Sequence, residues 1–198
     1  MFVLTADQVS SRTTPDRVGA TLRRLNRGFS DRLRLPAERT AGDELQLLVA
    51  AGADALEACL RLDREGGWSI GVGVGSVNLP LPAGVRESAG DAFIAARAAV
   101  DRAKKRPTRF AIEHEHSPEG AADAEALIDL LLILRSRRSS EGWELYDLLG
   151  SAGTQAEAAA TLGITPQAAS KRALAAGLRV ERAAMAPLAR QLDRLDQN

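Results

Sequence analysis

The sequence predicts an α+β protein, in which a mixed α/β part is followed by an all-helical part. Strand-like and helix-like segments alternate over residues 1–116. A small, polar stretch then begins at Ser117, and beyond it the apolar spacing is helical to the end of the 198 residues. That length suffices for one large or two small domains. We therefore expect a domain boundary between residues 116 and 117.

The mixed part opens with a compact apolar run, FVLTA, and a helix follows after Asp16. Two strand-like segments flank the turn signal AGD, which predicts a hairpin over residues 40–43. A helix from about Ala53 ends at Gly66 and Gly67. The next strand, WSIGVGVGSV, alternates apolar residues with glycines, so we expect another element to pack closely on its bare side.

A helix over DAFIAARAAVDRAKK and a strand over RFAIEHEH complete this part. The order is strand, helix, hairpin of two strands, helix, strand, helix, strand. Such an order predicts a split α/β sandwich of the ferredoxin-like type.

The second part contains several helix patterns. ALIDLLLILRSRR is apolar almost all round, which predicts a buried central helix, and WELYDLLG predicts a shorter one. In the last helix, apolar residues follow a 3-4-3 spacing: Met185, Leu188, Leu192 and Leu195. This row could be a seam shared by two copies of the chain, or it could pack on its own domain.

Residues 154–177, TQAEAAATLGITPQAASKRALAAG, favour two short helices joined by a tight turn. Ala158 and Ala159 allow close approach of a second helix, Gly163 permits a sharp turn, and Ile164 is expected to fill the core between the helices. The pattern therefore predicts a helix-turn-helix. An ordinary alanine-rich helical hairpin is the alternative interpretation.

The second of these helices has a start and a stop signal. Thr165 is a typical N-cap, Pro166 suits the first helical position, and Gly177 suits the left-handed residue that ends a helix. The stretch resembles the helix-turn-helix of sigma-factor region four and of other bacterial transcription regulators. By that resemblance and by residue type, the DNA-binding candidates are Thr165, Gln167, Ser170, Lys171 and Arg172.

The implied partner is double-stranded DNA, and the implied assembly is a homodimer. Residues 154–182 carry only four cations and two acids, and one such unit buries little surface. Specific affinity would therefore need two copies on paired half-sites. The whole chain has 26 Lys and Arg and 26 Asp and Glu, which excludes binding to polyanions through bulk charge.

Two carboxylates are candidates for a metal site in the first part. Asp7 ends the first strand and Asp43 lies in the hairpin turn, and in a split sandwich these strands are central neighbours. Both carboxylates would then lie at one edge of the sheet, where they could hold Mg²⁺ with a nucleotide's phosphates. Alternatively, Asp43 is a turn residue that bonds its own backbone, and Asp7 caps the entry to a helix.

The same segments resemble the catalytic domain of diguanylate cyclases and class III nucleotide cyclases over most of residues 1–114. The resemblance rests on Asp7, the hairpin AGDEL, the strand SIGVGVG and the later AKKRPTRF. It implies that Asp7 and Asp43 bind metal and that Lys104, Lys105 and Arg106 hold phosphates of a nucleotide ligand. Active diguanylate cyclases have two glycines in this hairpin, and Ala41 replaces the first.

A cyclase-like domain followed by a helix-turn-helix is similar to SatD-like proteins, which are small bacterial regulators. The resemblance rests on LTADQVSSR and RTAGDELQ. We therefore expect a cytoplasmic, sequence-specific transcription regulator whose degenerate cyclase-like domain pairs subunits or senses a nucleotide. The competing hypothesis is a metal-dependent nucleotide cyclase or nucleotidyl transferase with a regulatory helical tail. No membrane segment is expected, because the longest apolar run, LLLIL, is far shorter than the roughly 20 residues that cross a bilayer.

Three weaker signals are interpreted as structural. His114 and His116 lie two apart on a strand end but lack a third metal ligand at useful spacing. Cys59 lies on an apolar helix face, which indicates a core residue more than a nucleophile. The basic run RSRRSS indicates a solvated surface more than a phosphate contact.

Overall fold

The computed structural model describes residues 1–152 and 154–197, which contain five strands and eight α-helices, in agreement with the predicted α+β class. The chain forms two compact units. The sheet unit comprises Met1–Asp129 together with the chain from Pro187 onward, and the helical unit is Leu130–Ala186. This division differs from the boundary expected at Ser117. The chain leaves the sheet unit inside helix α4 (Pro118–Ser136) and returns to it inside helix α8 (Leu178–Leu195).

The sheet unit contains one five-stranded sheet in the order β2-β3-β1-β4-β5. Neighbouring strands are antiparallel except for the parallel pair β4 and β5. The strands alternate with helices along the chain as predicted. Their bounds are β1 (Phe2–Gln8), β2 (Leu33–Ala41), β3 (Glu44–Val49), β4 (Trp68–Val74) and β5 (Phe110–His114).

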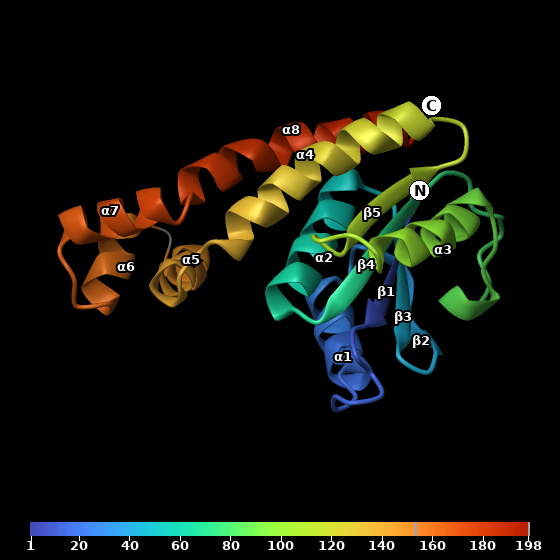
Figure 1. The fold of residues 1–198 in the computed structure, drawn as a ribbon, viewed down its shortest axis with the longest axis horizontal. Helices are drawn as coiled ribbons and strands as arrows, with labels where there is room; N and C mark the ends of the chain where they lie inside the picture. Colours follow the sequence, from blue (N-terminus) through green and yellow to red (C-terminus); the bar gives the residue numbers. More distant parts are fainter. Residues whose placement is uncertain (153, 198) are drawn as a thin grey trace. The chain divides into compact units, whose positions relative to one another are not determined.

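Helices cover both faces of this sheet, with α1 (Val18–Gly28) and α2 (Gly52–Glu65) on one side and α3 (Asp91–Ala103) on the other (Figure 1). The close packing predicted for the glycine strand is present. A Cβ atom built on Gly73 would lie 2.0 Å from the carbonyl oxygen of Ala92 in α3, so only glycine allows this approach.

The strand register separates the two sides of the core. Leu4 of β1 pairs with Leu47 and Val72, whereas its neighbour Val3 pairs with Leu48. Because side chains alternate along a strand, Val3 and Leu48 point to the opposite face and pack near Ala92 and Ala96 of α3. Cys59 of α2 is 2% exposed, as expected for a core residue.

Three of the four residues in the apolar row of α8 pack on their own chain, and Met185 is half-buried. Leu188, Leu192 and Leu195 are buried. The side chain of Asp193 between them accepts a hydrogen bond of 2.6 Å from the backbone N–H of Gly52. This end of α8 therefore completes the sheet unit, which explains the apolar spacing without a partner.

The sequence predicted that α4 is buried on all sides, but one face of the helix is exposed to solvent. Ile128, Leu131 and Leu132 are buried, but Leu130 is 66% exposed. Leu127 and Ile133, three residues before and after it, are also exposed. Protein packs on one side of this helix only, so an all-round apolar sequence leaves a stripe in solvent. In the part of the chain that the structure describes, no helix has both the length and the hydropathy to cross a lipid bilayer.

Candidate functional site

The helical unit contains two short helices over the segment that the sequence singled out, α6 (Gln155–Thr161) and α7 (Pro166–Ala175). Helix α6 begins with a capping box, in which the hydroxyl of Thr154 accepts from the N–H of Glu157 at 3.2 Å. The carboxylate of Glu157 accepts in return from the N–H of Thr154 at 3.0 Å. This pair satisfies two backbone donors that a helix start otherwise leaves open.

The turn between the helices depends on Gly163, whose φ is +63°. The N–H of Gly163 donates to the carbonyl of Ala160 at 3.1 Å, and the N–H of Ile164 donates to that of Ala159 at 3.0 Å. These two bonds form a Schellman motif, which requires a left-handed residue and so favours glycine. Ile164 itself is only half-buried, so it does not fill the core as expected.

Helix α7 has the start and the end that the sequence predicts. The hydroxyl of Thr165 accepts from the N–H of Ala168 at 3.1 Å, and Pro166 occupies the first turn. Gly177 follows the helix with a φ of +66°. Both ends of α7 are therefore fixed by local chemistry.

Helix α5 (Ser140–Ala152) fills the core behind α6 and α7. Its Leu145 is fully buried in a cluster with Ala158 of α6 and Ala176 at the end of α7. Large leucines on α5 therefore compensate for the small alanines on the other two helices, which explains how an alanine-rich pair can pack.

The predicted DNA-binding residues lie on α7 or at its cap, and four of the five are exposed: Thr165, Gln167, Ser170 and Lys171. Ser170 accepts a hydrogen bond of 2.7 Å from the side-chain amide of Gln155. Arg172 is half-buried and lies 3.2 Å from a carboxylate oxygen of Glu144 on α5. Gln167 and Lys171, one helical turn apart, are thus the exposed members of the set whose side chains make no hydrogen bond or ion pair with the described residues.

The basic run after α4 is a structural feature that the sequence interpretation missed. Arg135 and Arg138 are buried and both pair with the buried carboxylate of Glu181 on α8, while Arg137 between them is exposed. Arg138 also stacks over Trp143, with its guanidinium carbon 4.3 Å from the ring centroid. No local signal could have identified this network, because Glu181 lies more than 40 residues away in sequence.

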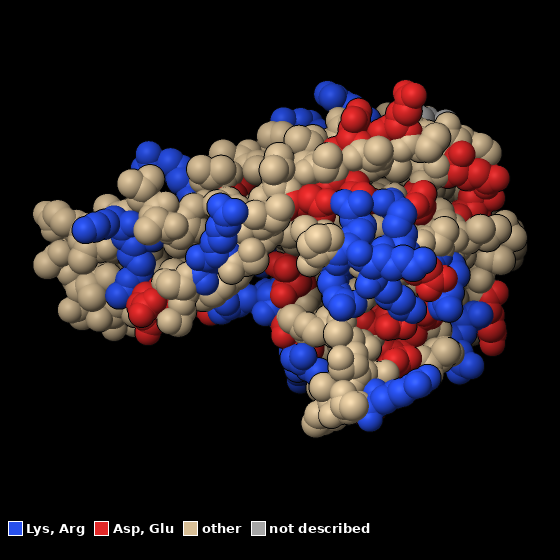
Figure 2. Space-filling model, viewed as in Figure 1, with Lys and Arg blue, Asp and Glu red and all other residues tan. Residues whose placement is uncertain are grey.

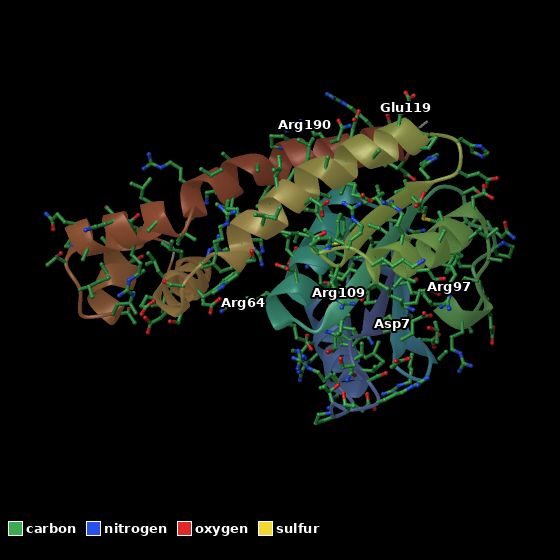
Figure 3. The ribbon with its side chains drawn as sticks, in the orientation of Figure 1. Asp7, Arg64, Arg97, Arg109, Glu119 and Arg190 are labelled. Carbon is green, nitrogen blue, oxygen red and sulfur yellow. The ribbon has the colours of Figure 1, made fainter. Side chains whose placement is uncertain are left out.

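In the sheet unit, the strand pairing brings Asp7 beside the hairpin turn, as the topology predicts. Asp7 pairs with Glu44 in the register of β1 and β3, and the N–H of Gln8 donates to the carbonyl of Asp43 at 3.0 Å. Figure 3 labels Asp7 at this end of the sheet. The ammonium of Lys104 lies 2.9 Å from a carboxylate oxygen of Asp7. A cationic side chain therefore already balances this carboxylate.

Lys104 also affects the second carboxylate. A hydrogen bond from Ser11 is the main cause that lowers the pKa of Asp43, and the charges of Lys104 and Arg12 add to it. Burial alone would lower the pKa of Lys104, but its hydrogen bond with Asp7 and the charges of Asp7 and Asp101 outweigh burial and raise it. In this arrangement the charge of Asp7 is balanced by Lys104, so Mg²⁺ binding at this edge would compete with an ion pair.

The three expected phosphate-binding residues point to different partners. Lys104 pairs with Asp7, as described, and Lys105 is exposed. Arg106 pairs with Glu125 of α4 at 2.9 Å and with Asp129. Phosphate binding by all three together would require these ion pairs to open.

A different group of possible metal ligands lies at the far end of β5. Ligand atoms of Asp91, Glu115 and His116 lie within 4.8 Å of one another, on partly or fully exposed residues. His114 does not join them, because its Nδ1 accepts hydrogen bonds of 3.1 Å from the N–H groups of His116 and Ser117. Of the two histidines, only His116 belongs to this group. The sequence spacing did not suggest Asp91, which lies 24 residues before Glu115.

The chain was compared with protein-family models, with curated proteins and with solved structures. No protein-family model matches the chain, and no curated protein matches it. The solved structure of a regulator of polyketide synthase expression from Bifidobacterium adolescentis is similar at a TM-score of 0.31 and 11% sequence identity. That alignment covers 99% of this chain and 79% of the other chain.

Proposed function

We propose that this protein is a sequence-specific DNA-binding transcription regulator, with α6 and α7 as its helix-turn-helix. The observation that carries the proposal is the turn at Gly163, where a left-handed residue joins two capped short helices and leaves one side of the second helix in solvent. In such motifs the second helix enters the major groove. Helix α7 has the length and the polar exposed residues for that role.

The exposed residues of α7 have suitable chemistry for both kinds of DNA contact. Gln167 near the start of the helix can pair with a base edge, and adenine is the base that glutamine amides bind best. Lys171, one turn later, can hold a phosphate. The N-terminal end of a recognition helix lies nearest the bases, which matches this order.

The proposed regulator binds DNA as a pair of copies. The helical unit has few exposed cations: over this unit Figure 2 shows only small, separate blue groups, whereas a larger blue cluster lies over the sheet unit. A single copy would therefore have little sequence-independent affinity. Two copies on half-sites about 10 base pairs apart, or a multiple of that spacing, would supply the missing contacts.

The proposed role of the sheet unit is ligand sensing on a degenerate cyclase-like scaffold. The antiparallel order β2-β3-β1-β4 supports this assignment, because it is the order of a ferredoxin-like split sandwich. The ion pair of Asp7 with Lys104 favours sensing over metal-dependent nucleotidyl transfer. We therefore place no catalytic step at this edge.

The test begins with genomic DNA fragments selected on the full chain, followed by fluorescence anisotropy on the recovered sequence. A Gln167→Ala/Lys171→Ala variant should bind at least tenfold more weakly. Lys171→Ala alone should weaken all sequences alike and reduce the salt slope by about one, whereas Gln167→Ala alone should relax the preference at one base pair by about 1–3 kcal/mol.

Arg190→Ala is the matched control, because Arg190 is an exposed cation on α8 within the sheet unit and should not affect DNA binding. Light scattering of the complex should give two chains per recovered site. If the double variant is folded by circular dichroism and binds the recovered sequence with native affinity, the proposal is wrong.

A further inference from the structure

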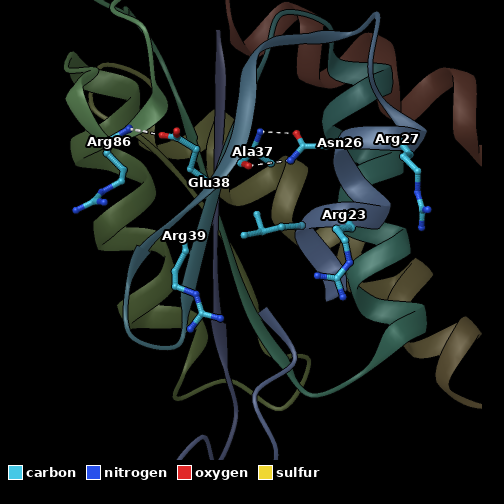
Figure 4. Close-up of a pocket in the computed structure, with 8 residues that line it drawn as sticks. Arg23, Asn26, Arg27, Ala37, Glu38, Arg39 and Arg86 are labelled. Atoms are coloured by element: carbon cyan, nitrogen blue, oxygen red, sulfur yellow. Dashed lines mark hydrogen bonds between the residues drawn. The ribbon is translucent and has the colours of Figure 1, made fainter. Parts of the chain in front are cut away.

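The sheet unit has a second feature that the proposed DNA contact does not use, an open pocket at the free edge of β2. Its volume is about 560 Å³, and α1, β2 and the short 3-10 helix η1 (Val85–Glu87) contribute its walls (Figure 4). Four arginines and one glutamate are among its lining residues: Arg23, Arg27, Arg39, Arg86 and Glu38. The chain as a whole has no net charge, so this is a local concentration of positive charge.

Three of these guanidinium groups have no ion-pair partner among the described residues, and the pocket's acid, Glu38, accepts instead from the backbone N–H of Arg86 at 3.3 Å. Within residues 1–152 and 154–197, the side chains of Arg23, Arg27 and Arg86 make no ion pair or hydrogen bond. Arg39 differs, because it pairs with Asp16 at 2.5 Å. Several other arginines of the sheet unit are paired, as Arg102 is with Glu125 at 2.6 Å. The pocket therefore brings three unpaired guanidinium groups together with a single lining carboxylate, that of Glu38.

Two arginines of the pocket repel each other on helix α1. Arg23 and Arg27 are four residues apart, so they lie on the same face of the helix, and like charges at this spacing destabilise a helix. A bound anion would remove that repulsion. Arginine also suits the task, because its planar fork of N–H donors matches the oxygens of a phosphate group.

The pocket floor is rigid and partly apolar. The side chain of Asn26 donates to the carbonyl of Ala37 at 2.9 Å and accepts from its N–H at 2.8 Å, as a neighbouring strand would. This pair closes the strand edge at Ala37 and so prevents a peptide from adding there as a further strand. Leu22 also lines the pocket and supplies an apolar surface next to the cations.

We infer that this pocket binds a small polyphosphate anion of the nucleoside triphosphate class. Its volume lies within the range of roughly 300–1,000 Å³ that is typical of small-molecule sites. Several guanidinium groups spread around the opening suit more than one phosphate, and Leu22 offers a surface for a base. The inference rests on the sensing role of the sheet unit in the proposed function, but it does not depend on DNA binding.

The test is isothermal titration calorimetry of the full chain, without DNA, against inorganic triphosphate, ATP and GTP at low and at physiological salt. At least one ligand should bind, and affinity should fall as salt rises. Tighter binding of a nucleotide than of triphosphate would assign a nucleotide site, and equal binding would assign a site for the polyphosphate alone. If none of the three ligands binds at 1 mM, the inference is overturned. A dissociation constant of 1 mM corresponds to a binding free energy of about −4 kcal/mol.

Two variants locate the site. Arg23→Ala/Arg27→Ala should weaken binding at least tenfold. Arg190→Ala/Arg194→Ala removes two exposed arginines at the same spacing from α8, and it should change affinity less than twofold. Equal effects of the two double variants would overturn the inference, as would loss of binding in Lys105→Ala, which would place the ligand elsewhere. Because no DNA is present, a negative result leaves the DNA-binding proposal to its own experiment.

Discussion

Arg138 donates from its Nε to the carbonyl oxygen of Ala176 at 3.0 Å, and Ala176 is the residue that ends α7. The last carbonyl groups of a helix have no partner within the helix, so a buried arginine here satisfies one of them. The same guanidinium pairs with Glu181. The end of the proposed recognition helix is thus held by a buried ion network.

This network predicts a large difference between breaking it and replacing it. Glu181→Ala leaves the buried charges of Arg135 and Arg138 without a carboxylate, which should cost about 3–5 kcal/mol in the free energy of unfolding. A combined Arg135→Met/Arg138→Met/Glu181→Leu variant should recover most of that loss, because no buried charge remains. Urea denaturation measures both. Arg137→Ala, at the exposed position between the arginines, should change stability by less than about 0.5 kcal/mol.

Two glycines of the helical unit should respond to alanine in opposite directions. Gly163 has a φ of +63°, so Gly163→Ala forces a left-handed alanine and should destabilise by about 1–2 kcal/mol, although a Cβ would meet nothing within 4 Å. Gly150 lies in helix α5 with equally open surroundings. Gly150→Ala should therefore stabilise by about 0.5–1 kcal/mol. Thermal unfolding measures both changes. If the two variants shift the melting temperature in the same direction, the turn geometry is contradicted.

Close packing between β4 and α3 predicts a severe effect at Gly73. The added Cβ of Gly73→Ala would overlap backbone atoms of Ala92 and Ala96, and backbone cannot move aside as a flexible side chain can. We expect a loss of about 3 kcal/mol or more. Ile94→Ala on the same helix is the control, since Ile94 is 70% exposed and should change stability by less than about 0.5 kcal/mol. Equal stability of both variants would show that α3 does not lie against this strand.

The lowered pKa of Asp43 predicts a pH dependence on the acid side. A carboxylate whose pKa is lower when folded stabilises the protein above its ordinary value of 3.8, and this contribution is lost as pH falls through the folded pKa. The stability advantage of the native chain over Asp43→Asn should therefore be constant near neutral pH and shrink below about pH 4. Ser11→Ala should reduce the advantage, because the Ser11 hydrogen bond is the main cause of the shift. A difference that is the same at pH 3 and pH 7 would contradict this account.

The elements of the fold could be predicted where local chemistry determines them. Gly163 and Gly177 mark helix ends through backbone conformation, and the glycines of β4 mark a close approach, all within a few residues of sequence. Features that join distant segments could not be predicted in this way. The exposed stripe on α4 and the assignment of the α8 leucines depend on which surfaces meet, and helical periodicity carries no information about that.

The candidate site follows the same division. The caps and exposed residues of α7 lie in one continuous stretch, so their spacing identified them. The salt bridge of Lys104 with Asp7 joins residues 97 positions apart, and the arginines of the β2 pocket come from three separate elements. The net charge of the chain gave no indication of that pocket, because acids elsewhere in the chain balance the pocket's surplus of cations.

The discontinuity of the sheet unit has a consequence for biosynthesis. Its sheet is encoded by the first 114 residues, yet Ala189, Leu192 and Asp193 supply the surface against which the start of α2 is held at Gly52. On the ribosome, the nascent sheet must wait for the entire helical unit to be translated before that surface exists. Arrest of synthesis after α4 and before α8 would therefore leave the start of α2 without its cover, and chaperones and proteases act on such incompletely packed chains.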